Sequence, residues 1–169
     1  MFTPEDLAIV MRLALEETTP EARLAPIADT LGLEFDKLRQ ALKQAHEAGV
    51  YNVDRHRVNR LALTEFLLHG ARYAYPPVWL PRGPGVPTAY SANPLREALF
   101  IDTNDEIVWP DAAGTCNGSG LEPLAPWVPR VARSNSQVHE FFALVDAMRV
   151  GRARERNLAV IGITKRLAA

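Results

Sequence analysis

Polar side chains that suit contact with nucleic acid recur within two short segments of the sequence. In the first segment they are Lys37, Arg39, Gln40, Lys43 and Gln44. The second segment contributes only arginines, namely Arg55, Arg57 and Arg60. Lysine and arginine bind phosphate oxygens or guanine edges, and glutamine can pair with adenine through two hydrogen bonds. These residues are therefore candidate DNA-binding residues.

The first segment is predicted to be a helix over about residues 34–48. Apolar residues recur within it at the spacing of one helix face, which predicts that this face is buried. The expected buried stripe consists of Leu38, Ala41, Leu42 and Ala45. If this stripe faces the core, the lysines and glutamines point outward. A shorter helix is predicted before it, over about Leu24–Leu31, with Pro26 in the first turn, where proline is tolerated. Gly32 can supply the positive φ that ends such a helix.

These two helices carry the features of a known recognition motif. Ala28 is small enough for a close helix crossing, Leu-Gly-Leu at 31–33 makes the turn, Leu38 packs behind it, and Glu-Ala-Gly-Val closes the segment at 47–50. The segment resembles the helix-turn-helix of winged-helix transcription regulators, including MarR-type proteins. The resemblance covers roughly the first 60 residues. It implies a protein that binds double-stranded DNA, and such regulators usually bind paired half-sites as two-fold dimers.

Three points stay open at this level. The helices can also form a plain bundle with a solvated outer face, and helix-turn-helix folds also serve as docking modules for proteins. The segment from Val53 to Val58 is either a short hairpin with Arg55 and Arg57 near its tip or an irregular basic turn. In both cases it leads into a helix over about residues 59–73.

The remaining sequence suggests a mainly α protein with minor β elements. Thr3-Pro4-Glu5-Asp6 predicts a helix start that extends to about residue 17. Six of the thirteen prolines fall between positions 76 and 94, which predicts an extended linker or an ordered arm and excludes a helix or a central strand. Short strands are expected at 107–109 and 115–116, with turns at 111–114 and 117–120. Helices follow from about 134, capped by Ser134 or Ser136, and from 152 after a break at Gly151.

We therefore expect three regions. Residues 1–75 form the helix-turn-helix domain, residues 76–133 form a Pro-rich and irregular region, and residues 134–169 form helices for dimerisation or partner binding. The apolar side that includes Phe141, Phe142 and Met148 is either core or a dimer seam. The basic run that begins at Arg149 is a second DNA contact, a docking face for an acidic partner, or a solvated helix end.

Charge and composition restrict the function further. The net charge is −1, but residues 37–60 hold six basic and two acidic residues, and residues 149–169 hold six basic and one acidic residue. Such basic islands favour local contacts with anions. The acidic N-terminus is unlike a secretory signal, which is basic. No apolar run is long enough for a membrane helix. The single cysteine excludes an internal disulfide. We expect a cytoplasmic protein.

Chemistry at a catalytic or metal centre is not indicated. The four histidines, at 46, 56, 69 and 139, lack metal-ligand spacing, and Cys116 has no sequence cue for an activating base. The sequence predicts no enzyme, no metal and no cofactor. The predicted function is a sequence-specific DNA-binding regulator, acting as a dimeric repressor. The alternative is an adaptor, similar to repressor antitoxins, whose C-terminal half holds a protein partner.

Overall fold

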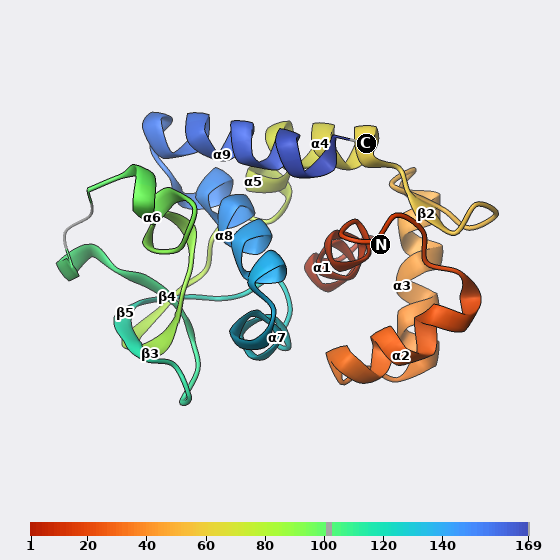
Figure 1. The fold of residues 1–169 in the computed structure, drawn as a ribbon, viewed down its shortest axis with the longest axis horizontal. Helices are drawn as coiled ribbons and strands as arrows, with labels where there is room; N and C mark the ends of the chain where they lie inside the picture. The colour runs from red at the N-terminus through yellow and green to blue at the C-terminus, as the bar shows by residue number, and fades with distance from the viewer. Residues whose placement is uncertain (101–102, 169) are drawn as a thin grey trace.

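The computed structural model describes residues 1–100 and 103–168, which form a mainly helical chain with two small sheets (Figure 1). The structure confirms the expected mainly α composition with minor β elements. Buried apolar side chains from the first to the last helix form one contiguous cluster. The fold therefore holds the N-terminal helices, the sheet region and the C-terminal helices around a shared core.

Helix α1, Pro4–Leu13, lies between α3, Phe35–Glu47, and α8, Ser136–Val150 (Figure 1). Thr3 caps it as predicted, since its side chain accepts a hydrogen bond from the Asp6 amide at 3.1 Å, and the Asp6 carboxylate accepts one from the Thr3 amide at 2.8 Å. This is a capping box. The helix ends at Leu13 and is therefore shorter than expected, and two carbonyls just beyond its end bond to a side chain from another element, described below.

Helix α2, Glu21–Leu31, begins earlier than predicted, so Pro26 lies inside the helix and not in its first turn. The missing Pro26 amide would have bonded to the carbonyl of Ala22, which is a solvent-exposed residue. Water can satisfy that carbonyl, so the proline is tolerated. Gly32 ends α2 with φ +68°, as expected. The predicted stripe of α3, which includes Leu38 and Ala45, is buried.

A two-stranded antiparallel hairpin follows α3, formed by β1, Tyr51–Asn52, and β2, Arg57–Val58. Of the two alternatives left open by the sequence, the hairpin is therefore the observed one. The next predicted helix is interrupted at Gly70, which separates α4, Arg60–His69, from α5, Ala71–Ala74.

The Pro-rich stretch is ordered, and the expectation that it could not be a central strand is wrong. Strand β3, Trp79–Pro87, lies between β4, Ile107–Pro110, and β5, Cys116–Leu121, in a small closed barrel. Residues 79–80 and 83–84 pair with β5, residues 86–87 pair with β4, and Gly85 pairs with both. Most of β3 thus has a partner on one side only, and the register shifts between Leu80 and Gly83. Prolines are compatible with such one-sided pairing and with bulges.

The predicted turn at 117–120 is also wrong, since these residues belong to β5, which runs antiparallel to β3 and parallel to β4. The predicted turn at 111–114 is observed, where the Gly114 amide donates to the Asp111 carbonyl at 2.9 Å. Gly118 allows β5 to approach its neighbour closely, because a Cβ at this position would lie 2.5 Å from the Glu106 carbonyl oxygen. The glycines that suggested a turn therefore permit close backbone contact in a strand.

Short helical segments connect the barrel to the C-terminal helices. These are η1, Ala89–Ser91, α6, Leu95–Ala98, η2, Thr103–Asp105, and α7, Val128–Ser134. Residues 76–133 were expected to be Pro-rich and irregular, but α7 already begins at Val128, with Pro129 in its first turn, where proline needs no amide partner. Helix α8 is capped by Asn135 and not by either predicted serine, since Asn135 Oδ1 accepts from two amides of the first turn. Helix α9, Ala153–Leu167, follows the break at Gly151.

Helix α8 is buried from Phe141 to Arg149. Its apolar residues Phe141, Phe142 and Met148 are at most 5% exposed. This side of α8 is therefore core, and the dimer-seam alternative for it is wrong.

Candidate nucleic-acid interface

Helix α3 lies on the outer side of the N-terminal half, with its buried stripe against α1 and α2 (Figure 1). The turn between α2 and α3 sets the orientation of α3. This turn is tight, since the Leu33 amide donates to the Ala28 carbonyl at 2.9 Å and the Gly32 amide donates to the Asp29 carbonyl at 3.1 Å. Bonds of this kind satisfy the last carbonyls of α2. The polar side of α3 is left at the surface.

The predicted residues of α3 divide into two flanks. On the first flank, Lys37 Nζ lies 2.7 Å from Glu5 Oε2, and Gln44 Oε1 accepts a hydrogen bond from the amino group of Met1 at 2.7 Å. Lys37 and Gln44 therefore face the N-terminal segment. They are occupied in part by contacts within the chain.

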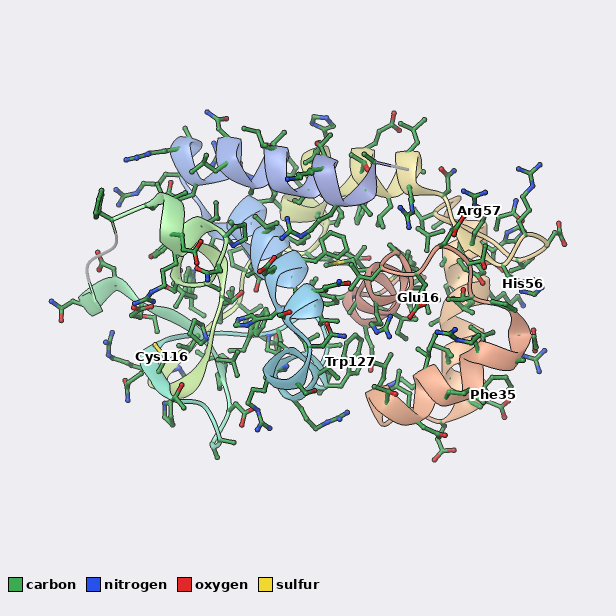
Figure 2. The ribbon with its side chains drawn as sticks, viewed as in Figure 1. Glu16, Phe35, His56, Arg57, Cys116 and Trp127 are labelled. Atoms are coloured by element: carbon green, nitrogen blue, oxygen red, sulfur yellow. The ribbon has the colours of Figure 1, made fainter. Side chains whose placement is uncertain are left out.

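The second flank carries Arg39, Gln40 and Lys43, which are exposed. Together with Tyr51 and His56 they line a groove of about 550 Å³ between α2, α3 and the hairpin. Figure 2 shows Phe35 on this side of the molecule, and the Arg39 guanidinium lies 5.8 Å from the centre of its ring. The structure therefore brings three of the predicted residues together in one groove.

The charge of this first groove is balanced. Arg39 and Lys43 line it from α3, but so do the carboxylates of Glu21 from α2 and Asp36 from α3. Attraction to a polyanion is therefore weak here, and the groove suits hydrogen bonding to base edges better than general phosphate binding.

The hairpin is anchored at both ends of its loop. The Asn52 side chain accepts from the Arg55 amide at 2.9 Å, and the Thr19 amide donates to the His56 carbonyl at 2.8 Å. His56 has a positive φ of 48°. Figure 2 shows His56 and Arg57 at this end of the molecule. The loop is thus held against the α1–α2 connection.

A second groove, of about 600 Å³, lies between the hairpin and the start of α4. Its charged and polar lining consists of His46, Asn52, Arg55, Arg57, Asn59 and Arg60. No carboxylate lines it among the residues that the structure describes. Three arginines without an opposing acid make this groove the more favourable place for a phosphate.

Arg60 has a structural role in addition to lining the second groove. Its Nη2 donates to the carbonyls of Ala14 at 3.0 Å and Glu16 at 3.1 Å. These are the carbonyls that follow the last turn of α1, so Arg60 binds the negative end of that helix. The side chain joins α4 to α1 and is less available to an outside ligand than Arg55 or Arg57.

His46 also belongs to the site, although it is not among the residues that the sequence predicts to bind DNA. It lines both grooves, and its Nδ1 lies 3.2 Å from the Tyr51 carbonyl oxygen. Helical spacing contained the signal, since His46 follows Lys43 by three positions and Arg39 by seven.

The C-terminal basic run does not form one surface. Arg149 is 7% exposed and bonds Asp146, and Arg156 donates to the Gly151 carbonyl at 2.8 Å. Arg152 and Arg154 are exposed. The run therefore offers less positive charge to a partner than its sequence suggests.

Cys116 and His139 line a separate pocket of about 440 Å³ beside the barrel. Burial, followed by the negative charge of Glu106, raises the pKa of the Cys116 thiol. A raised pKa keeps the thiol protonated and disfavours nucleophilic chemistry. His139 Nε2 is 2.6 Å from the Pro87 carbonyl oxygen.

Within the described part of the chain, no group of three or more His, Cys, Asp or Glu residues is placed to hold a metal ion.

Compared with known protein families, curated proteins and solved structures, the chain matches none. Within residues 1–100 and 103–168, none of the helices combines the length and apolar character needed to cross a bilayer.

Proposed function

We propose that the protein is a sequence-specific regulator that binds double-stranded DNA through α3 and the hairpin, as a winged helix-turn-helix. The observation that carries the proposal is the pair of grooves on either side of the hairpin. One holds the exposed hydrogen-bonding residues of α3, and the other holds three arginines and, within residues 1–100 and 103–168, no lining carboxylate. In DNA recognition, contacts to base edges give sequence specificity and contacts to phosphates position the protein, and the two grooves separate these two kinds of contact.

In this proposal α3 enters the major groove. Arg39, Gln40 and Lys43 face the base edges, since they are exposed and lie on the flank opposite Lys37 and Gln44, which contact the N-terminal segment. Arg55 and Arg57 bind the phosphate backbone beside them. Arg60 fixes the start of α4 through its bonds to the end of α1.

The regulator is proposed to act as a dimeric repressor. One α3 helix and two free arginines give few contacts, and each good base contact contributes only about 1–3 kcal/mol of discrimination. Two copies on paired half-sites double that contribution, which favours a two-fold dimer.

The experiment begins with selection of bound duplexes from a random pool by the full-length protein. Affinity for the selected duplex and for a scrambled one is then measured by fluorescence anisotropy. The triple variant Arg39→Ala, Gln40→Ala, Lys43→Ala is expected to lose the preference, by about tenfold or more for each lost base contact.

The matched control is the double variant Lys37→Ala, Gln44→Ala, on the same helix but on the flank that faces the N-terminus. It is expected to keep most of the preference. If the protein selects no duplex from the pool, the proposal is wrong. It is also wrong if the triple variant keeps the wild-type preference for the selected duplex.

An adaptor that binds a protein partner is the second candidate. The barrel side favours it, because Trp79 is 53% exposed and Val78 is 48% exposed next to each other, and Phe100 is fully exposed. Large exposed apolar residues that gather on one side are typical of interaction sites. A pull-down with Trp79→Ala as the negative control tests this candidate, and it is compatible with DNA binding at the other end of the molecule.

A further inference from the structure

His46 lies in the last turn of α3, where this helix meets the hairpin (Figure 1). Its side chain is exposed and lines both grooves of the candidate interface. It follows Lys43 by three positions, so the two side chains are neighbours on one side of the helix. A duplex that contacts Lys43 therefore also comes close to His46.

One nitrogen of the His46 ring is occupied by a contact within the chain. Nδ1 lies 3.2 Å from the carbonyl oxygen of Tyr51, which is within hydrogen-bond distance. A carbonyl oxygen can only accept, so Nδ1 is the donor and carries a proton in the neutral ring as well as in the charged ring. Tyr51 is buried in β1, which holds the acceptor in place. The backbone of the hairpin thus fixes the tautomer of neutral His46.

The other ring nitrogen, Nε2, has no hydrogen-bond partner among the residues that the structure describes. Because the proton of the neutral ring is on Nδ1, Nε2 has a lone pair and can only accept a hydrogen bond. When the ring is protonated, Nε2 becomes a donor and the side chain a cation. His46 therefore presents an acceptor to the grooves in its neutral state only.

The neighbouring cations of α3 cannot supply this acceptor. Arg39 and Lys43 only donate hydrogen bonds, so they match the N7 and O6 acceptors of guanine in the major groove. An acceptor matches the exocyclic amino groups instead, which are N4 of cytosine and N6 of adenine. His46 is thus suited to base edges that Arg39 and Lys43 cannot bind.

We propose that His46 is a base-contacting residue, whose Nε2 accepts a hydrogen bond from the amino group of a cytosine or an adenine in the major groove. The proposal rests on the proposed DNA-binding function and adds to it a contact whose direction is set by the Tyr51 carbonyl. Protonation converts Nε2 into a donor and removes the contact. The preference for the selected duplex over a scrambled one is therefore expected to fall as the pH falls.

Several other ionisable groups face His46 and could contribute to a pH dependence. In the first groove they are Glu21 from α2, Asp36, Arg39 and Lys43 from α3, and Tyr51 and His56 from the hairpin. In the second groove they are Arg55 and Arg57 from the hairpin and Arg60 from α4. Burial raises the pKa of Tyr51. Carboxylates, lysine and arginine ordinarily titrate outside the range of about pH 5.5 to 7.5, whereas histidine titrates within it. His56 therefore needs a control of its own.

The first experiment determines the tautomer and needs no DNA. Two-bond ¹H–¹⁵N NMR of the labelled full chain distinguishes a ring nitrogen that carries a proton from one that carries a lone pair. At about pH 8.5, where histidine rings are ordinarily neutral, Nδ1 of His46 is expected to be protonated and Nε2 unprotonated. The signals of His46 are those absent from the spectrum of His46→Gln. A neutral ring with its proton on Nε2 overturns the proposal.

The second experiment measures the preference for the selected duplex by fluorescence anisotropy, at about pH 7.5 and about pH 5.5. The wild-type preference is expected to be smaller at the lower pH. His46→Leu removes the acceptor and is expected to lower the preference about tenfold at the higher pH, with no further fall on acidification. His46→Gln is the matched variant, because its amide oxygen accepts but does not titrate. It is expected to keep most of the preference at both pH values.

His56→Asn is the control for the second histidine of the first groove, since asparagine tolerates the positive φ of 48° at this position. This variant is expected to keep the pH dependence of the wild type, and circular dichroism at both pH values confirms that each variant is folded. The proposal is overturned if His46→Leu keeps the wild-type preference, or if the wild-type preference is equal at the two pH values. A pH dependence that persists in His46→Gln also overturns it.

The two experiments separate failure of this contact from failure of the proposed function. A protein that selects no duplex overturns the DNA-binding function, and the contact of His46 with it, whatever the tautomer is. A protein that selects a duplex but whose preference does not depend on His46 keeps the DNA-binding function and overturns only the contact.

Discussion

Trp109 and Asp146 are joined by a buried hydrogen bond, in which the indole Nε1 donates to Oδ2 at 2.7 Å. Thr88 Oγ1 donates to the same oxygen at 2.8 Å, and Arg149 Nη1 donates to Oδ1 at 2.7 Å. Arg149 Nε also donates a hydrogen bond to the Tyr75 carbonyl oxygen at 2.8 Å. The carboxylate, 1% exposed, therefore holds the barrel, α8 and the end of α5 together.

Replacement of Asp146 by Asn is expected to destabilise the protein strongly. The substitution removes the negative charge that compensates the buried Arg149 guanidinium. Removing one member of a buried pair typically costs about 3–5 kcal/mol. Urea unfolding followed by tryptophan fluorescence measures the free energy of unfolding. Asp111→Asn breaks the more exposed pair with Arg133, 3.1 Å in the native protein, and is expected to cost about 1 kcal/mol or less. Equal losses in the two variants contradict this account of Asp146.

Gly32→Ala is expected to destabilise the α2–α3 turn. Gly32 has φ +68°, a left-handed conformation that costs a residue with a Cβ about 1–2 kcal/mol. Gly83→Ala is the control, since φ there is not positive and an added Cβ would meet nothing within 4 Å. That control is expected to be neutral or slightly stabilising. Thermal unfolding compares the two, and a Gly32 variant as stable as the Gly83 variant would show that the turn carries no such strain.

Local signals explain why the N-terminal helices were predictable. The Thr3 cap, the positive φ at Gly32 and the apolar spacing of α3 each act within a few residues, so the sequence displays them directly. Pro26 predicts a later N-terminus for α2 than the observed one, because proline is favoured in the first turn of a helix. Its actual position depends on solvent access to the Ala22 carbonyl, which is a property of the folded chain.

The barrel was not predictable from the same rules. Prolines and glycines argue against a strand that is paired on both sides, and β3 satisfies this restriction by changing partners at Gly85. Such an exchange depends on pairing between segments far apart in sequence, which local patterns do not contain.

The candidate site was predictable in part. Helical periodicity separates the exposed side of α3 from the buried one, but it does not reveal that Lys37 meets Glu5 or that Gln44 meets Met1. Nor does spacing reveal that Arg60 binds carbonyls more than forty positions earlier, at Ala14 and Glu16. Tertiary contacts decide which of the predicted cations remain free.

Cys116 is expected to react slowly with iodoacetamide at neutral pH. Burial and then the negative charge of Glu106 raise its pKa, so less of the thiol is ionised than in free cysteine, and the rate should rise with pH into the alkaline range. Glu106→Gln removes the negative charge and is expected to lower the pKa and speed alkylation. Glu140→Gln, at the same pocket, is the control and should leave the rate unchanged. Alkylation as fast as that of free cysteine at neutral pH contradicts the expectation.

Salt dependence separates the two grooves of the proposed DNA interface. Each arginine that neutralises a phosphate releases counterions, so the slope of log affinity against log salt concentration changes by about 1 for each contact removed. Arg55→Ala and Arg57→Ala are each expected to flatten the slope and to weaken binding to selected and scrambled duplexes alike. Gln40→Ala is expected to leave the slope unchanged and to reduce only the preference for the selected duplex, because a neutral amide releases no counterion. Anisotropy titrations at several salt concentrations measure both quantities. If the slope responds to Gln40 and not to the arginines, the assignment of phosphate contacts to the hairpin and base contacts to α3 is wrong.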